Sequence, residues 1–197
     1  MKLLIAVPTY DTWEADFGAS LALTMADLSR GEGIEALRLA KCEATIIAEG
    51  RTDLVRDALE HGASHILWCD ADMKFRPSHV RTLMEHDVDI VGTTYRKRRP
   101  PHVWTAQDMN GDRIEPGEGP LVEAKHIGFG LALIKVSVFE TVPEPWFAFP
   151  WIEEFKRFMG EDIWFCNHAR AHGFKTYVDP KASIGIGHVG KQILGAD

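Results

Sequence analysis

Cysteine is scarce in this sequence, and its spacing gives no sign of cross-linking. The 197 residues include 3 cysteines, Cys42, Cys69 and Cys166, and no two of them form a CxxC pair. An odd number of widely separated cysteines predicts neither a disulfide framework nor a cysteine zinc site. This cysteine usage favours a reducing compartment, and we expect the cytoplasm.

Long apolar runs are also missing. No window approaches the roughly 18 apolar residues of a membrane-spanning helix. The apolar residues 3–7 end at Pro8, a run shorter than the roughly 7–15 residues of a secretory h-region. There is no internal repeat and no linker-like segment, so the sequence predicts one domain over residues 1–197.

Several nucleotide-binding and metal-binding motifs are absent or incomplete. There is no P-loop and no HExxH. Gly185, Gly187 and Gly190 satisfy the GxGxxG pattern of dinucleotide-binding folds. That pattern needs a helix and a second strand after it, and residues 191–197 are too few to form them. We therefore expect no dinucleotide site there.

The formal charge of −7 comes from one half of the chain. Residues 1–95 contain 9 Lys and Arg against 16 Asp and Glu, whereas residues 96–197 contain 13 of each. The second half opens with a basic run, Arg96, Lys97, Arg98 and Arg99. Such a run is most often a solvated loop, and the alternative is a contact with nucleic-acid phosphates. The net charge therefore does not exclude a polyanionic partner.

Apolar runs alternate with helical patterns in the first half. Strands are expected at residues 3–7, 36–42, 66–69 and 90–92, with helices at 16–29, at 51–61 and from Pro77 onward. This alternation predicts an α/β fold with a mostly parallel central sheet flanked by helices. Beyond residue 95 we expect a hairpin turn at Asn110 and Gly111, a strand pair within 122–134, a helix at 161–172 and a strand at 175–178.

Two carboxylates follow the third expected strand. Asp70 and Asp72 flank Ala71 directly after the apolar residues 66–69. Open α/β sheets bind ligands at the carboxyl ends of their strands, and two carboxylates there could hold Mg²⁺ or Mn²⁺ together with phosphate oxygens. A loop whose aspartates cap turns is the alternative. A haloacid-dehalogenase-like phosphatase fits less well, since that family has its pair after the first strand and a Thr or Val where Lys74 stands.

Three further features each have more than one interpretation. Glu161 and Asp162 begin the expected helix at 161–172 and either complement its dipole, act as a base, or join the earlier aspartates in a two-metal nuclease. His188 lies among glycines and is either a metal ligand or an exposed histidine. The aromatic residues within 146–158 form either a core or a stacking platform.

Taken in order, these features resemble a GT-A fold glycosyltransferase, closest to glycosyltransferase family 2 and its compact bacterial and phage relatives. The matching stretches are residues 5–10, Arg51 with Leu54 and Val55, 66–73, 127–130, 160–166 and 173–188. They cover nearly the whole chain in the expected order. The resemblance implies a single Rossmann-like GT-A domain with a small antiparallel second sheet.

The resemblance also implies a nucleotide-sugar site over residues 1–95. Its loop for the base and ribose would comprise Pro8, Thr9, Tyr10 and Asp11, with Arg51 nearby. Asp70 would contact the ribose or a metal-bound water, with Ala71 beside it. Asp72 and His188, with Asp70 as a further candidate, would bind Mn²⁺ or Mg²⁺ on the diphosphate. The turn from Gly128 to Gly130 would line the sugar pocket.

An acceptor site is implied over residues 96–197, where Asp162 would be the general base and Glu161 the second candidate. The activity implied is the metal-dependent, inverting transfer of a sugar from a UDP- or GDP-linked donor to a hydroxyl, in a bacterial or phage-infected cytoplasm. The acceptor would be a hydroxymethylated base in DNA, a glycan, a lipid or a small molecule. Two alternatives stay open: a non-catalytic nucleotide-sugar or nucleic-acid binding module, and a two-metal nuclease.

Overall fold

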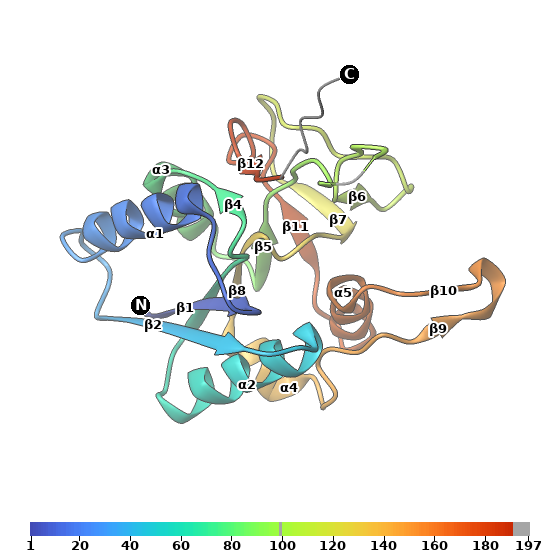
Figure 1. Cartoon of the computed structure of the whole chain (residues 1–197), viewed down its shortest axis with the longest axis horizontal. Coiled ribbons are helices and arrows are strands. Elements are labelled where there is room, and N and C mark those ends of the chain that lie inside the picture. The colour runs from blue at the N-terminus through green and yellow to red at the C-terminus, as the bar shows by residue number, and fades with distance from the viewer. Residues whose placement is uncertain (99, 191–197) are drawn as a thin grey trace, which may run out of the picture.

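A computed structural model of the chain describes residues 1–98 and 100–190, so Arg99 of the basic run lies outside the described residues. Its centre is an eight-stranded sheet in the order β2-β1-β3-β8-β5-β11-β7-β6 (Figure 1). The strands are β1 (Lys2–Thr9), β2 (Ala36–Glu43), β3 (His65–Cys69), β5 (Ile90–Gly92), β6 (Gln107–Asp108), β7 (Val122–His126), β8 (Leu131–Lys135) and β11 (Thr176–Val178).

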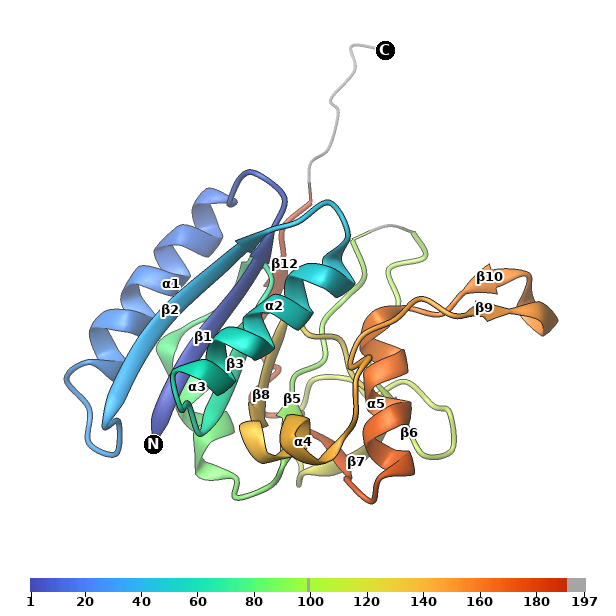
Figure 2. The ribbon, with the colours of Figure 1, turned by 90° about the horizontal axis from the view of Figure 1, so that it is seen from below.

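Helices cover both faces of this sheet (Figure 2). On one face lie α1 (Ala15–Leu28) and α3 (Pro77–Glu85), and on the other α2 (Ile47–Glu60), α4 (Val136–Thr141) and α5 (Glu161–Ala171). Strand β1 shows why its run is apolar throughout. Leu4 and Ala6 pack into the core beneath α2, whereas Leu3, Ile5 and Val7 pack toward α1, so both faces of the strand are buried.

The sheet is mixed. β8 lies between β3 and β5 and is antiparallel to both, and β7 is antiparallel to β11 and β6. The remaining strands run in one direction, as a mostly parallel sheet requires. The α/β fold class is thereby confirmed.

The expected strand pair within 122–134 is wrong. Both strands exist, as β7 and β8, but β5 and β11 separate them in the sheet. Their connection is buried rather than a surface hairpin turn, because Ile127 and Phe129 belong to the core. Because this connection crosses the sheet, β7 pairs with β11 and β6, whereas β8 pairs with β3 and β5.

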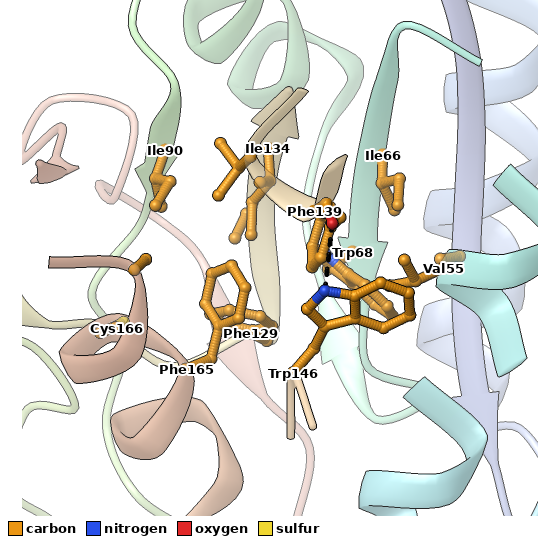
Figure 3. Packing of buried hydrophobic residues seen from close by; sticks show 14 of the residues in the cluster. Val55, Ile66, Trp68, Ile90, Phe129, Ile134, Phe139, Trp146, Phe165 and Cys166 are labelled. Carbon is orange, nitrogen blue, oxygen red and sulfur yellow. Dashed lines mark hydrogen bonds between the residues drawn. The ribbon is translucent and has the colours of Figure 1, made fainter. Parts of the chain in front are cut away.

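The aromatic segment is buried in its first part and exposed in its last part. Trp146 and Phe147 are buried, and the indole Nε1 of Trp146 donates to the carbonyl oxygens of Phe139 at 3.1 Å and Val142 at 2.8 Å (Figure 3). The rest forms a hairpin of β9 (Trp151–Ile152), a 3₁₀ turn (Glu153–Phe155) and β10 (Arg157–Phe158). This hairpin projects from the body of the molecule in Figures 1 and 2. The segment is therefore core at its start and exposed at its end.

A small second sheet lies beside Asp70-Ala71-Asp72, which we call the DxD segment. β12 (Gly187–His188) pairs antiparallel with β4 (Met73–Lys74), with His188 opposite Met73. Together with β9 and β10 this makes two antiparallel sheets of two strands in the described part of the chain. Within that part, no helix has both the length and the apolar character needed to cross a membrane.

Candidate functional site

The segment Asp70-Ala71-Asp72 forms a turn at the carboxyl end of β3. The amide of Asp70 donates to the carbonyl of Gly130 at 3.1 Å, which continues the β3–β8 pairing by one residue. The amide of Met73 donates back to the carbonyl of Asp70 at 3.1 Å and closes the turn. Both aspartate side chains are thus placed by backbone hydrogen bonds at the edge of the sheet.

Asp72 and His188 meet although they are far apart in the sequence. The amide of Val189 donates to the carbonyl of Asp72 at 2.7 Å, and His188 Nε2 lies 3.2 Å from Asp72 Oδ2. The other ring nitrogen, Nδ1, lies 3.1 Å from the carbonyl oxygen of Arg96, and the ring of Tyr95 packs edge-on against the imidazole. The imidazole is therefore fixed in orientation by contacts on several sides.

This pairing shifts the pKa of both groups. Burial by itself lowers the pKa of His188, but the hydrogen bond and charge of Asp72 outweigh it and raise the pKa. Burial likewise opposes ionisation of Asp72, and the contacts with His188 and Arg98 outweigh it and lower the pKa. Asp72 is therefore a carboxylate at neutral pH.

The basic run 96–99 does not form one uniform patch. Arg98 Nη1 donates to Asp72 Oδ2 at 2.7 Å. The guanidinium of Arg96 lies 4.4 Å from the centre of the Trp104 ring, and the Lys97 side chain faces a different hollow. The described members of the run thus have three different environments.

Arg51 is a buried cation that links both pairs of carboxylates predicted from the sequence. Its side chain is on α2 and is 1% exposed. Nη2 donates to Asp70 Oδ1 at 2.8 Å, and Nε donates to Glu161 Oε1 at 3.2 Å. The guanidinium also lies 5.3 Å from the ring centre of Trp68. Arg51 therefore holds the carboxylates of Asp70 and Glu161 in place from a buried position.

Glu161 and Asp162 differ in their surroundings at the start of α5. The carboxylate of Glu161 is bound by Arg51, whereas Asp162 lines an open hollow. Burial, and then the charge of Glu161, raises the pKa of Asp162 to about 6. A Cβ at Gly160 would lie 2.7 Å from Asp162 Oδ1, so glycine leaves the room that this carboxylate occupies.

A hollow of about 320 Å³, the Asp72 hollow, gathers most of the residues predicted to hold a nucleotide sugar. The predicted residues that line it are Pro8, Thr9, Tyr10, Asp11, Asp70, Ala71, Asp72 and His188. Beside it lies a second hollow of about 360 Å³, which shares Pro8, Thr9 and Tyr10 and extends to Cys42 and Gly50. Tyr10 is 69% exposed at the rim.

Gly128 and Gly130 are buried around Tyr95, a residue that the sequence did not single out. A Cβ would lie 2.4 Å from the Tyr95 hydroxyl oxygen at Gly128 and 2.6 Å from it at Gly130. The amide of Gly130 donates to that oxygen at 2.8 Å. Neither glycine lines the Asp72 hollow. Nothing in the neighbouring sequence marks Tyr95 as different from other aromatic residues.

A hollow of about 540 Å³, the Asp162 hollow, lies beside the start of α5. Its lining includes Asp162, Phe155, Phe158, Lys97, Arg113, Lys125 and Arg157. The four cations come from separate segments of the chain, so the sequence alone did not bring them together.

A divalent cation fits the Asp72 hollow when its other ligands come from a substrate. The described residues contain no cluster of three or more His, Cys, Asp or Glu side chains that would hold a metal by themselves. Asp72 and His188 offer one carboxylate and one imidazole. Mg²⁺ commonly uses one or two carboxylates plus phosphate oxygens and water, and imidazole suits first-row cations such as Mn²⁺.

Comparisons with known proteins identify structures with a similar fold. No protein-family model matches this chain, and no curated protein matches it. The crystal structure of A197 from STIV matches with a TM-score of 0.57 and 18% identity, over 90% of this chain and 81% of that one. The crystal structure of GalNAc-T7 with UDP, GalNAc and Mn²⁺ matches with a TM-score of 0.56 and 9% identity, over 91% of this chain but 42% of that one. At these identities the likeness concerns the fold, and the chain has a GT-A-like fold that it shares with a glycosyltransferase.

Proposed function

We propose that this protein is a glycosyltransferase that moves a sugar from a nucleoside-diphosphate sugar to a hydroxyl acceptor. One observation carries the proposal: Arg51 binds one carboxylate next to each of two hollows of different chemistry. On one side it holds Asp70 beside the Asp72–His188 pair, and on the other it holds Glu161 beside Asp162. Two-substrate transfer needs this arrangement, with one hollow for the donor and one for the acceptor.

The donor would occupy the Asp72 hollow. Pro8, Thr9, Tyr10 and Asp11 would hold the nucleoside, and its base would lie in the neighbouring hollow at Cys42. Asp70 would contact the ribose or act as a further metal ligand. In the resemblance, Gly128 and Gly130 border the sugar, and here they would do so through Tyr95, which they surround.

Asp72 and His188 would hold Mn²⁺ or Mg²⁺. The crystal structure of GalNAc-T7 with UDP, GalNAc and Mn²⁺ supports this choice. When bound, the cation would stabilise the negative charge that develops on the departing diphosphate. Arg98, which donates to Asp72, supplies a positive charge from this chain at the same place.

Asp162 would be the general base, and the reaction would invert the configuration at the anomeric carbon. A base works best with a pKa near the working pH, and the pKa of Asp162 is raised to about 6. Glu161 is bound by Arg51, so we assign it a positioning role. Residues 1–95 would then form the donor half and 96–197 the acceptor half.

The three cysteines are free in the structure, which suits a reducing compartment, and we place the protein in the cytoplasm. This assignment rests on cysteine chemistry alone.

The test is a thermal-shift screen of UDP- and GDP-sugars with and without Mn²⁺, followed by assays of donor hydrolysis and transfer. A ligand that binds the folded state raises its melting temperature. We expect a shift that needs Mn²⁺ and is lost in Asp72→Asn but kept in Asp162→Asn, which should lose turnover. Glu85→Gln, an exposed carboxylate on α3, is the matched control.

Two other outcomes would redirect the assignment. Donor binding without any hydrolysis or transfer would indicate a non-catalytic binding module. Degradation of DNA or RNA in the absence of a sugar donor would indicate a two-metal nuclease.

A further inference from the structure

Four cationic side chains in the Asp162 hollow have no carboxylate partner among the described residues. Lys97, Arg113, Lys125 and Arg157 all line this hollow, and none of them forms an ion pair with a residue that the structure describes. Arg113 Nη1 donates only to a backbone carbonyl, that of Thr105 at 3.4 Å. Elsewhere on the molecule, exposed cations such as Arg38 and Lys175 are paired with carboxylates. The hollow therefore presents four positive charges that no described carboxylate pairs with directly.

The cations also affect the pKa of His126, at the end of β7. Its pKa is lowered to about 4, first by burial and then by the charges of Arg113, Lys125, Lys97 and Arg170. The imidazole is neutral at physiological pH, so it leaves the cations as the dominant charges of the lining. Among residues 1–98 and 100–190, Asp162 is the single carboxylate that lines the same hollow. An anionic ligand would be attracted here, and its charge would be met from several sides.

Exposed aromatic rings lie beside these cations. Phe155 and Phe158 line the hollow and are 58% and 65% exposed. They belong to the projecting β9–β10 hairpin (Figure 1), where the guanidinium of Arg157 lies 5.4 Å from the Phe155 ring centre and Trp151 packs edge-on against Phe158. Large rings left in water on a projecting element indicate a binding surface.

We propose that the acceptor in the Asp162 hollow is a segment of a nucleic-acid strand. Phosphates would contact the four cations, and an unstacked base would lie against Phe155 and Phe158. Cationic grooves combined with aromatic rings are the means by which proteins bind single strands, because every base has a face that can stack. Four cations from four separate segments exceed what one small anion needs and match a chain of phosphates.

The chemical step rests on the proposed glycosyltransferase function. A hydroxyl of the bound nucleotide would attack the anomeric carbon of the donor sugar and form the new carbon–oxygen bond. The bond from that carbon to the diphosphate would break, and the diphosphate would leave with the electron pair. Asp162 would take the proton of the hydroxyl.

Strand binding can be measured without any sugar donor, which separates this proposal from the transferase assignment. The probe is a labelled single-stranded oligonucleotide of mixed sequence, about 12 nucleotides long, within the range of known single-strand sites. Fluorescence anisotropy at a series of salt concentrations gives the affinity and its salt dependence. With four phosphate contacts, the slope of log K against log salt should be roughly −3.

The variants separate charge from stacking. Lys125→Gln and Arg157→Gln should each weaken binding several-fold and reduce the magnitude of the slope by roughly 0.7. Phe158→Ala should weaken binding by about 5-fold to 100-fold with the slope unchanged. Arg30→Gln and Leu23→Ala, an exposed cation and an exposed apolar side chain at α1, should change neither quantity. The altered side chains are exposed, so melting temperatures should match that of the wild type.

Three results would overturn the proposal. The first is oligonucleotide binding that Lys125→Gln, Arg157→Gln and Phe158→Ala leave unchanged. The second is equal binding of heparin with no effect of Phe158→Ala, which would indicate a general polyanion surface. The third is binding of inorganic pyrophosphate in this hollow with no binding of the oligonucleotide, which would indicate a small anionic acceptor. Strand binding without transfer, by contrast, would leave this proposal standing and count against the transferase.

Discussion

Arg51 Nε donates to Glu161 Oε1 at 3.2 Å, across 110 residues of sequence. The same guanidinium binds Asp70, so one buried cation fixes the start of α5 relative to the carboxyl end of β3. This contact gives the two acidic residues at the helix start different surroundings. Glu161 is engaged by Arg51, and Asp162 is the carboxylate that faces a hollow.

Replacing Arg51 by Met should destabilise the protein strongly. The change leaves Asp70 and Glu161 without their buried cation, and removing one partner of a buried ion pair costs about 3–5 kcal/mol. Urea unfolding measures the loss in free energy of unfolding. Arg38→Met breaks the exposed pair with Asp57 and should cost far less, because solvent screens such a pair. Equal losses in the two variants would contradict the supporting role of Arg51.

Local patterns in the sequence identified much of this fold. The apolar run of β1, the strand that ends at Asp70 and the helix that starts at Glu161 all depend on neighbouring residues, and the structure has them where they were expected. The helix expected at 51–61 begins four residues earlier in the structure, since α2 starts at Ile47.

What the sequence could not predict depends on contacts between distant segments. The insertion of β8 between β3 and β5 follows from a buried connection, and nothing local distinguishes that connection from a hairpin turn. The contact of Arg98 with Asp72 and the grouping of the cations around Asp162 have the same origin. The burial of Arg51 is also a tertiary fact, since most arginines are exposed.

Asp162→Asn should stabilise the protein at neutral pH while removing the proposed transferase activity. The pKa of Asp162 is about 6 when folded and near 3.9 in an unfolded chain. The folded state therefore binds this proton more tightly, and its stability falls as the pH rises from about 4 to above 6, by at most about 3 kcal/mol. Asparagine carries no such charge, so the variant should gain stability over this interval and match the wild type below it.

Unfolding curves at a series of pH values test this difference, and the pH dependence of turnover tests the base. Wild-type kcat/KM should rise about tenfold per pH unit below the pKa of Asp162 and then level off, whereas Asp162→Asn should be lower by a factor on the order of 10²–10⁴. Full turnover in the variant would exclude Asp162 as the base.

Gly130→Ala should disturb the packing of Tyr95. The added Cβ would lie 2.6 Å from the Tyr95 hydroxyl oxygen and 2.8 Å from Met73 Sδ, and Met73 directly follows the DxD segment. Overpacking of this kind costs about 1–3 kcal/mol. Thermal unfolding should show the loss, while Gly117→Ala, where a Cβ would meet nothing within 4 Å, should stay near the wild type. An unchanged melting temperature in Gly130→Ala would mean that Tyr95 moves aside without cost.

Arg98→Gln should tighten the binding of Mn²⁺ to the protein in the absence of nucleotide. Arg98 Nη1 donates to Asp72 Oδ2 at 2.7 Å. Its guanidinium therefore competes with a cation for the carboxylate that we propose as a metal ligand. Exposed ion pairs contribute up to about 1 kcal/mol, so the dissociation constant should fall by no more than about 5-fold. Isothermal titration with MnCl₂ measures it. Arg96→Gln removes the same charge two residues away, where the guanidinium lies over Trp104, and should change the constant less. If both variants bind Mn²⁺ equally, the effect comes from net charge, and Arg98 does not compete for Asp72.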